Sequence, residues 1–436
     1  MDYNKMYQSR IVTAEEAVRQ IKSGQRIFLT GNCSVPQKVL GALVEYAPNL
    51  ENVEICQALT IGPADYVKPE MKGHLLVNTM FISANVRKAV QEGSADFTPV
   101  LLSEFTHLFK NHHLPLDAAL IQVSPPDEHG FCSLGIEVGL TKTPAESAKI
   151  IIAEVNQRMP RTLGDSFIHL SRLHYIVPVD YELPELLMGT GETDETVDKI
   201  AAYIADMIPD GATMQMGIGA IPDAVLKYLL NKRELGIHTE LFSDGVIDLF
   251  EAGVLTGAQK SIHPGKMIAG FIIGSHRLYQ WVDDNPLIEL HPTEYVNDPF
   301  VIAQNNNMVA INSAIEVDIT GQVCADSIGP KLYSGVGGQL DFIYGASRSK
   351  GGVPIIALPS ITSLKDGTIV SRIVPMLMHG AGVVTTRNHI RFVVTEFGVA
   401  ELYGKTIRQR SEALIKIAHP QFREELTHQA KALHYL

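Results

Sequence analysis

Short runs rich in valine, isoleucine and leucine recur along the chain, each followed by a loop and a segment with helical spacing. AALIQV at 118–123 and KIIIAEV at 149–155 are apolar at nearly every position. Strands buried on both faces have this composition, and they are typical of parallel sheets covered by helices. The alternation therefore predicts an α/β fold. The other runs that we predict as strands are 26–30, 53–56, 75–81, 174–179, 212–217, 238–242, 266–274, 308–317, 353–359 and 391–398.

Helix boundaries are marked by capping residues and prolines. Thr13-Ala-Glu-Glu16 has the capping-box pattern, which predicts a helix that ends near Gly24. Pro36 and Pro222 are expected at the first positions of two further helices. Segment 196–208 and the tail from Val399 also have helical spacing.

A change of composition at 181–196, YELPELLMGTGETDET, divides the chain. This stretch carries proline, glycine and acids with little periodicity, as linkers do. We therefore predict two open α/β domains with mainly parallel sheets, over residues 1–190 and 191–436. The total of 436 residues is long enough for two large domains.

The charge balance excludes several classes of partner. Lys plus Arg is 36 and Asp plus Glu is 48, so the net charge is −12, and no basic tract occurs. We therefore expect neither nucleic-acid nor membrane binding. Without a long uncharged apolar run or an apolar leader, we expect a cytoplasmic protein. The hydrophobic content of 45% is compatible with a homodimer, which we expect.

The four cysteines form no Cys-x-x-Cys pair, so reduced thiols packed as small apolar side chains are the simplest interpretation. FTHLFKNHH at 105–113 has neither the His-Glu-x-x-His spacing nor a cysteine partner. We therefore predict no metal site.

A glycine-rich turn, Gly217-Ile218-Gly219, lies between a predicted strand and a predicted helix. Glycines allow a ligand close to the backbone, and the helix N-terminus favours an anion. An ordinary tight turn fits a bare Gly-x-Gly equally well. A dinucleotide site also stays open, because Glu240 follows Gly219 by 21 residues, although Pro222 stands at the fingerprint's third position.

Glu240 and a second glycine turn are the other candidates for chemistry. We expect Glu240 at the carboxyl end of a buried strand, where open α/β sheets bind ligands. Glutamate is unusual in strands, yet it could also cap a helix or pair with a cation. The turn Ser334-Gly-Val-Gly337-Gly338 could offer backbone N–H groups to a developing oxyanion. Two glycine turns and one strand-end glutamate in the same half favour a catalytic site.

The loop SPPDEHGFCS at 124–133 follows a predicted strand and is stiffened by two prolines. Its serine, histidine and acids resemble the components of a hydrolase triad. No Gly-x-Ser-x-Gly elbow occurs in the chain, however, so we favour a positioning role or a role at the domain interface.

Several segments together resemble the acetyl-CoA hydrolase/transferase family. They include GIGAIPDAV at 217–225, GIHTELFSDGVIDL at 236–249, SGVGGQLDF at 334–342 and, in the first half, SPPDEHGFCSLG. The resemblance covers nearly the whole chain. It implies two α/β domains with the active site between them, and a ping-pong transfer of CoA between an acyl-CoA and a short-chain carboxylate.

The resemblance also implies roles for individual residues. Glu240 corresponds to the family's catalytic glutamate, which forms a glutamyl-CoA thioester, and Gly337 and Gly338 correspond to the oxyanion donors. CoA is then a substrate and covalent intermediate, and no tightly bound cofactor is expected. An acyl-CoA hydrolase in which Glu240 activates water is the nearest alternative, and an NAD-dependent oxidoreductase is a more distant one. The implied CoA contacts are Gln215, Met216, Gly217, Ile218, Gly219, Asn312, Gly335 and Lys350.

Overall fold

The computed structural model describes residues 2–186, 194–217 and 219–436. The chain forms two compact units: Met1–Leu186 with Ile268–Val296, and Leu187–Met267 with Asn297–Leu436. The chain therefore leaves the second unit at residue 268 and returns to it at 297. The predicted domains, 1–190 and 191–436, place segment 268–296 in the second domain, whereas the structure places it in the first unit. Composition does not reveal which unit such a segment joins.

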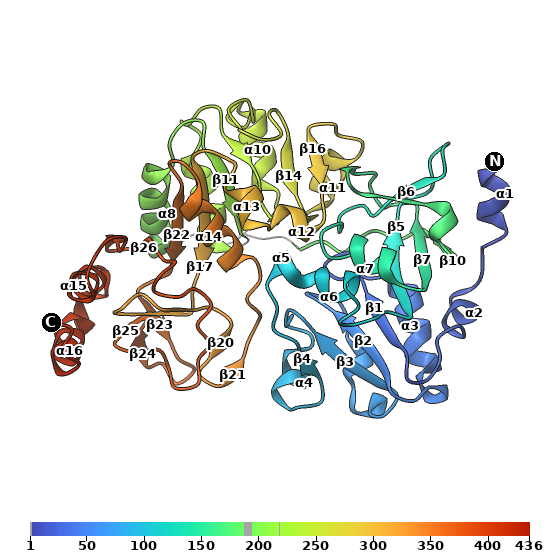
Figure 1. Cartoon of the computed structure of the whole chain (residues 1–436), viewed down its shortest axis with the longest axis horizontal. Coiled ribbons are helices and arrows are strands. Elements are labelled where there is room, and N and C mark those ends of the chain that lie inside the picture. Colours follow the sequence, from blue (N-terminus) through green and yellow to red (C-terminus); the bar gives the residue numbers. More distant parts are fainter. Residues whose placement is uncertain (1, 187–193, 218) are drawn as a thin grey trace. The chain divides into compact units, whose positions relative to one another are not determined.

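The first unit is built on a seven-stranded sheet, in the order β10-β7-β5-β1-β2-β3-β4 (Figure 1). All neighbouring strands are parallel. The central strands are apolar on both faces, as their sequences predict; all six residues of β5 are buried. The strands are β1 Arg26–Leu29, β2 Val53–Gln57, β3 Leu75–Thr79, β4 Asp96–Phe97, β5 Ala118–Val123, β7 Ile150–Asn156 and β10 Tyr175–Val179.

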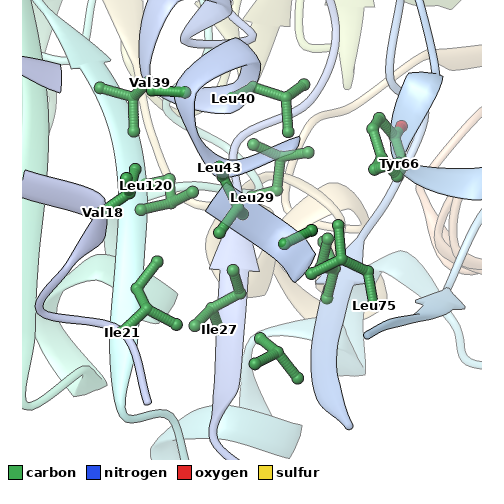
Figure 2. Packing of buried hydrophobic residues seen from close by; sticks show 14 of the residues in the cluster. Val18, Ile21, Ile27, Leu29, Val39, Leu40, Leu43, Tyr66, Leu75 and Leu120 are labelled. Atoms are coloured by element: carbon green, nitrogen blue, oxygen red, sulfur yellow. The ribbon is translucent and has the colours of Figure 1, made fainter. Parts of the chain in front are cut away.

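The core of this unit packs two helices against the sheet (Figure 2). Helix α2 (Ala14–Val18) begins with the predicted capping box, because Thr13 and Glu16 each bond the other's backbone N–H. Helix α3 (Gln37–Tyr46) contributes Val39, Leu40 and Leu43, which lie over Ile27 and Leu29 of β1. Pro36 is the N-cap of α3, one position before the expected first turn.

The second unit contains a six-stranded sheet, in the order β12-β11-β17-β22-β26-β27. Its neighbours are parallel except for β26 and β27, which form an antiparallel edge. The predicted α/β fold with two mainly parallel sheets is confirmed. The strands are β11 Thr213–Met216, β12 Gly236–Ile237, β17 Met308–Ser313, β22 Val353–Ala357, β26 Phe392–Thr395 and β27 Gly398–Glu401.

Helices of the second unit follow the strands as predicted. A core that includes Ile356, Val393, Leu414 and Ile417 joins the sheet to the C-terminal helices. Among the described residues, no helix combines the length and the apolar character that a membrane span requires. The principal helices are α8 Glu195–Met207, α9 Ala220–Tyr228, α10 Gly245–Glu251, α14 Gln339–Arg348, α15 Ile407–Ile417 and α16 Pro420–Ala432.

Two apolar runs that we predicted as single strands are each divided. Residues 266–274 form β14 (Met267–Ala269) and β15 (Phe271–Ile272), which are separated by Gly270. Residues 308–317 form β17 and then β18 (Glu316–Asp318), which belongs to a separate three-stranded sheet. The predictions of unbroken strands were wrong because hydropathy does not show where a strand changes sheet.

Candidate active site

The carboxyl end of β11 is the point at which the strand order of the second unit reverses. The next strand in the chain, β12, lies on one side of β11, and β17 lies on the other. Ligands of open α/β sheets bind at such points, where the loops diverge. The turn at Gly217 follows β11 directly, and Asn312 lies near the end of β17. Two of the predicted ligand-binding segments therefore lie at neighbouring strand ends.

Glu240 lies three residues beyond β12, in a bend that precedes β13 (Leu241–Phe242). The prediction of one continuous strand over 238–242 was wrong. Thr239 explains part of the break: its hydroxyl donates to the carbonyl oxygens of Met216 and Leu241, at 3.2 and 2.9 Å. The bend is thus fixed to the end of β11, and Glu240 remains at the expected carboxyl edge of the sheet.

Asn297 is the hydrogen-bond partner of the Glu240 side chain. Its Nδ2 donates to Glu240 Oε2 at 3.1 Å, and Asn297 is completely buried. Burial raises the pKa of Glu240 from 4.5 to about 7, and the Asn297 hydrogen bond opposes part of that rise by favouring the ionised form. Near neutral pH both the protonated and the ionised form of this carboxyl group are therefore populated.

Gly338 lies directly against the same carboxylate. A Cβ atom at position 338 would stand 1.7 Å from Glu240 Oε2 and 2.4 Å from Asn297 Nδ2. Its φ of −94° and ψ of 6° are accessible to other residues, so the need for glycine here is steric and not conformational. The second glycine turn and the predicted nucleophile are therefore in contact, as the sequence hypothesis requires.

The first glycine turn is open on its outer side. A Cβ atom at Gly217 or Gly219 would meet nothing within 4 Å, and Gly219 has a φ of +122°, which favours glycine. Helix α9 begins at Ala220 without a side-chain cap. Its first N–H groups suit an anion. Pro222 is therefore the third residue of α9 and not the first, as was predicted. The first four N–H groups of a helix have no intrahelical acceptor, so a proline at the third position costs no hydrogen bond.

The remaining residues of this turn differ in their placement. Met216 and Gly217 line, with Thr239, a pocket of about 10 Å³, which is the space of one water molecule. The turn is therefore adjacent to the bend that carries Glu240. Ile218, a further predicted contact, lies outside the described residues.

Gln215 joins β11 to β17 inside the sheet. Its Oε1 accepts hydrogen bonds from Ile311 N–H and Asn312 Nδ2, both at 3.1 Å. Gln215 is fully buried, and its Nε2 has no partner among the described residues. Gln215 therefore orients Asn312, which is only partly buried.

The other predicted residues separate into two groups. Gly335 and Gly337 lie in the turn before α14, and Gly337 has a φ of +60°. Lys350 is exposed beyond the opposite end of α14, where its carbonyl accepts from Asn307 N–H. Ten helical residues span about 15 Å. The structure therefore does not bring Lys350 together with the Glu240 and Gly338 pair.

Asn297 is not among the site residues that the sequence predicts. This residue lies between α12 (Thr293–Val296) and α13 (Pro299–Ile302), at the point where the chain re-enters the second unit. Asparagine is common at helix starts, so Asn297 does not stand out in the sequence. The adjacent Asp298 in fact caps α13, by accepting from Phe300 N–H at 2.8 Å. The signal available in the sequence was two successive candidate caps, Asn297 and Asp298, before a helix that needs only one.

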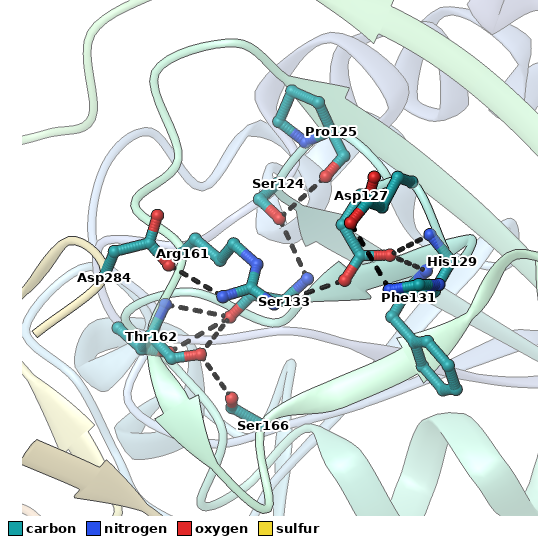
Figure 3. A network of polar contacts seen from close by, with 11 residues as sticks. Ser124, Pro125, Asp127, His129, Phe131, Ser133, Arg161, Thr162, Ser166 and Asp284 are labelled. Atoms are coloured by element: carbon teal, nitrogen blue, oxygen red, sulfur yellow. Dashed lines mark hydrogen bonds and ion pairs between the residues drawn. The ribbon is translucent and has the colours of Figure 1, made fainter. Parts of the chain in front are cut away.

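The loop at 124–133 in the first unit is fixed by a polar network (Figure 3). Asp127 accepts from the N–H groups of His129 and Phe131, and from Arg161 Nη2 at 3.2 Å. Arg161 also contacts Asp284 Oδ1 at 2.7 Å. Burial would raise the pKa of Asp127, but these donors outweigh it and hold the pKa below its usual value. The network therefore ties the loop to the 268–296 excursion within this unit.

Comparisons with known proteins point to one family. The N-terminal domain of the acetyl-CoA hydrolase/transferase family matches residues 1–186, and the C-terminal domain of that family matches residues 274–430. Glu240 lies between the two matched segments.

Similar proteins, two of which have solved structures, each match 99% or more of the chain. A 4-hydroxybutyrate coenzyme A transferase of Clostridium kluyveri is 48% identical over 99% of both chains. RipA from Yersinia pestis has a crystal structure that is 34% identical, with a TM-score of 0.91 and complete coverage of both chains. A 4-hydroxybutyrate CoA-transferase from Porphyromonas gingivalis is 39% identical, with a TM-score of 0.85 over 99% of this chain and 100% of that one.

Proposed function

The chain belongs to the acetyl-CoA hydrolase/transferase family, and we propose that it moves CoA between an acyl-CoA and a short-chain carboxylate through Glu240. The contact of Glu240 with Asn297 and Gly338 carries this proposal. The names of the relatives support the reaction class. A butyryl-CoA:acetate CoA-transferase of Anaerostipes caccae, for example, is 36% identical over 99% of this chain and 98% of its own. We propose 4-hydroxybutyrate or butyrate, with acetate, as the acids.

The proposed cycle has two half-reactions, and in every step a nucleophile replaces a leaving group at a carbonyl carbon. The Glu240 carboxylate attacks the thioester carbonyl, and CoA thiolate leaves, which produces an acyl-glutamyl anhydride. The thiolate then attacks the glutamyl carbonyl, so the first carboxylate departs and a glutamyl-CoA thioester remains. A second carboxylate enters and the same steps run in reverse. Covalent catalysis of this kind divides one difficult exchange into easier ones.

The geometry of the site suits these steps. Glu240 must be ionised to attack, and its pKa of about 7 leaves a substantial ionised fraction at neutral pH. Its Oε2 rests against Gly338, so the backbone of the 337–338 turn is adjacent to the Glu240 carboxyl carbon, at which the tetrahedral intermediate forms whenever thiolate attacks the anhydride or a carboxylate attacks the glutamyl-CoA thioester. Backbone N–H groups in such a position stabilise an oxyanion, and one such donor typically contributes about 10²–10³ in rate.

The CoA molecule would enter along the neighbouring strand ends. The open turn at Gly217 and Gly219 and the uncapped start of α9 suit an anionic group, and Asn312 offers a partly buried amide. Binding energy from these remote contacts can position the thioester for attack. The relatives from Clostridium kluyveri, Anaerostipes caccae and Porphyromonas gingivalis are named as CoA-transferases, and none of these names supports the dinucleotide interpretation of this turn.

Transfer and hydrolysis make different products, and that difference tests the proposal. We expect the protein to convert butyryl-CoA and acetate to acetyl-CoA and butyrate, with little free CoA. Release of CoA independent of acetate would instead identify a hydrolase in which Glu240 activates water. The variant Glu240→Gln is expected to lose exchange and to retain CoA binding. A matched panel of short carboxylic acids then ranks the acceptors.

A further inference from the structure

Gln339 joins the start of α14 to two distant segments of the second unit. Its Nε2 donates to the carbonyl oxygen of Ser313 at 2.7 Å, and its Oε1 accepts from Thr385 Oγ1 at 3.0 Å. Because a carbonyl oxygen only accepts, the Ser313 contact fixes which end of the amide is nitrogen. Gln339 as a whole is 7% exposed. One buried amide therefore uses both ends in a single orientation.

The two partners of Gln339 are themselves held by the backbone. Ser313 is the last residue of β17 and pairs with Ala357 of β22 inside the six-stranded sheet. Thr385 is fully buried, and its carbonyl accepts from Val323 N–H at 3.0 Å. Gln339 thus connects the helix start to two fixed points rather than to mobile side chains.

The start of α14 needs such an anchor. Its N-cap is Gly338, which has no side chain to bond the first N–H groups. The preceding Gly337 has the conformational freedom of glycine at a φ of +60°. The backbone that contacts Glu240 is therefore flexible by composition, and Gln339 is the adjacent residue whose side chain restrains it.

We propose that Gln339 is a positioning residue for the reaction: it sets the distance between the 337–338 turn and the Glu240 carboxylate. This inference rests on the proposed function. Gly338 lies so close to Glu240 Oε2 that no side-chain atom fits between them, so a small movement of the turn changes the site directly. A misplacement of about 1 Å at a reacting centre costs about 10²-fold in rate.

The test compares two changes that remove the same contact from opposite sides. Gln339→Met keeps the length of the side chain and removes both hydrogen bonds, whereas Thr385→Val removes only the hydroxyl. Thr385→Ser is the matched control, since it keeps the hydroxyl. Kinetics of butyryl-CoA:acetate exchange are measured well below the unfolding midpoint, so that all variants are folded.

For Gln339→Met we expect kcat to fall about 10²-fold, with KM for butyryl-CoA within about threefold of the wild-type value. Thr385→Val should lose about tenfold in kcat, and Thr385→Ser should retain the wild-type rate. If Gln339→Met fails to fold, the two threonine variants decide. Equal rates for Thr385→Val and Thr385→Ser would overturn the inference, as would a wild-type kcat in Gln339→Met. A wild-type protein without exchange activity would overturn the proposed function as well.

Discussion

Replacing Gly338 by alanine is the most direct perturbation of the contact between the glycine turn and Glu240. The new Cβ atom would stand 1.7 Å from Glu240 Oε2, whereas ordinary contacts begin near 3.4 Å, so the carboxylate must retreat by about 1.7 Å. Since 1 Å of misplacement costs about 10²-fold, we expect kcat/KM to fall by at least that factor. In free energy this is about 2.7 kcal/mol of transition-state stabilisation. The backbone at 338 tolerates alanine, so the protein should still fold.

The assay is butyryl-CoA:acetate exchange, with the unfolding midpoint measured in parallel. Gly41→Ala is the matched control, because its Cβ atom would meet nothing within 4 Å and it lies inside α3. That change should leave exchange unchanged and stabilise the protein by roughly 0.5–1 kcal/mol. A folded Gly338→Ala protein with kcat/KM within threefold of wild type would refute the steric reasoning.

Three further changes test the electrostatics. Because burial raises the pKa of Glu240 from 4.5 to about 7, its ionisation above pH 7 costs stability, and 1.36 kcal/mol per pKa unit gives roughly 3 kcal/mol. Glu240→Gln should therefore unfold at higher urea concentration than wild type at pH 8.5 but not at pH 4; equal stability at pH 8.5 would contradict this. Asn297→Ala removes the donor that favours the ionised form, so the midpoint of the kcat/KM profile against pH should move upward, and an unchanged midpoint counts against the assigned contact. Arg161→Ala removes contacts to Asp127 and Asp284, with an expected loss of about 1 kcal/mol in urea unfolding at pH 7. The pKa of Asp127 in the folded protein lies below its ordinary value of 3.8, so the ionised carboxylate stabilises the fold at pH values above 3.8. The loss caused by Arg161→Ala should therefore shrink as the pH falls below 4, and an equal loss at pH 3 would contradict the ion pairs.

Most of the strands could be predicted from the sequence, because a strand that is buried on both faces is a continuous apolar run. The run at 118–123 corresponds residue for residue to β5, and the capping box at Thr13 marks the start of α2. Local chemistry decides both features. The run at 308–317 contributes strands to two different sheets, and its local sequence does not show where one strand ends. The prediction of a single strand was therefore wrong there.

The candidate site was predictable in its strand-end residues and not in its contacts. A glutamate at the end of an apolar run and two glycine-rich turns are unusual in a sequence, so Glu240 and both turns could be singled out. Asn297 precedes the capping residue Asp298, and Gln339 is the first residue of α14, so neither is unusual for its local sequence; only the folded chain brings them to the site. Lys350 is a CoA contact only by the family resemblance, and it lies beyond the end of α14 that is opposite to Gly338, so its role stays a prediction.

Mass spectrometry of the Glu240 peptide is the most direct measurement of covalent catalysis. After incubation with butyryl-CoA and rapid quenching, we predict CoA attached through a thioester to Glu240, and its disappearance on addition of acetate. The Glu240→Gln protein should carry no adduct. Wild-type protein that turns over at its full rate while the Glu240 peptide stays unmodified would contradict the proposed mechanism.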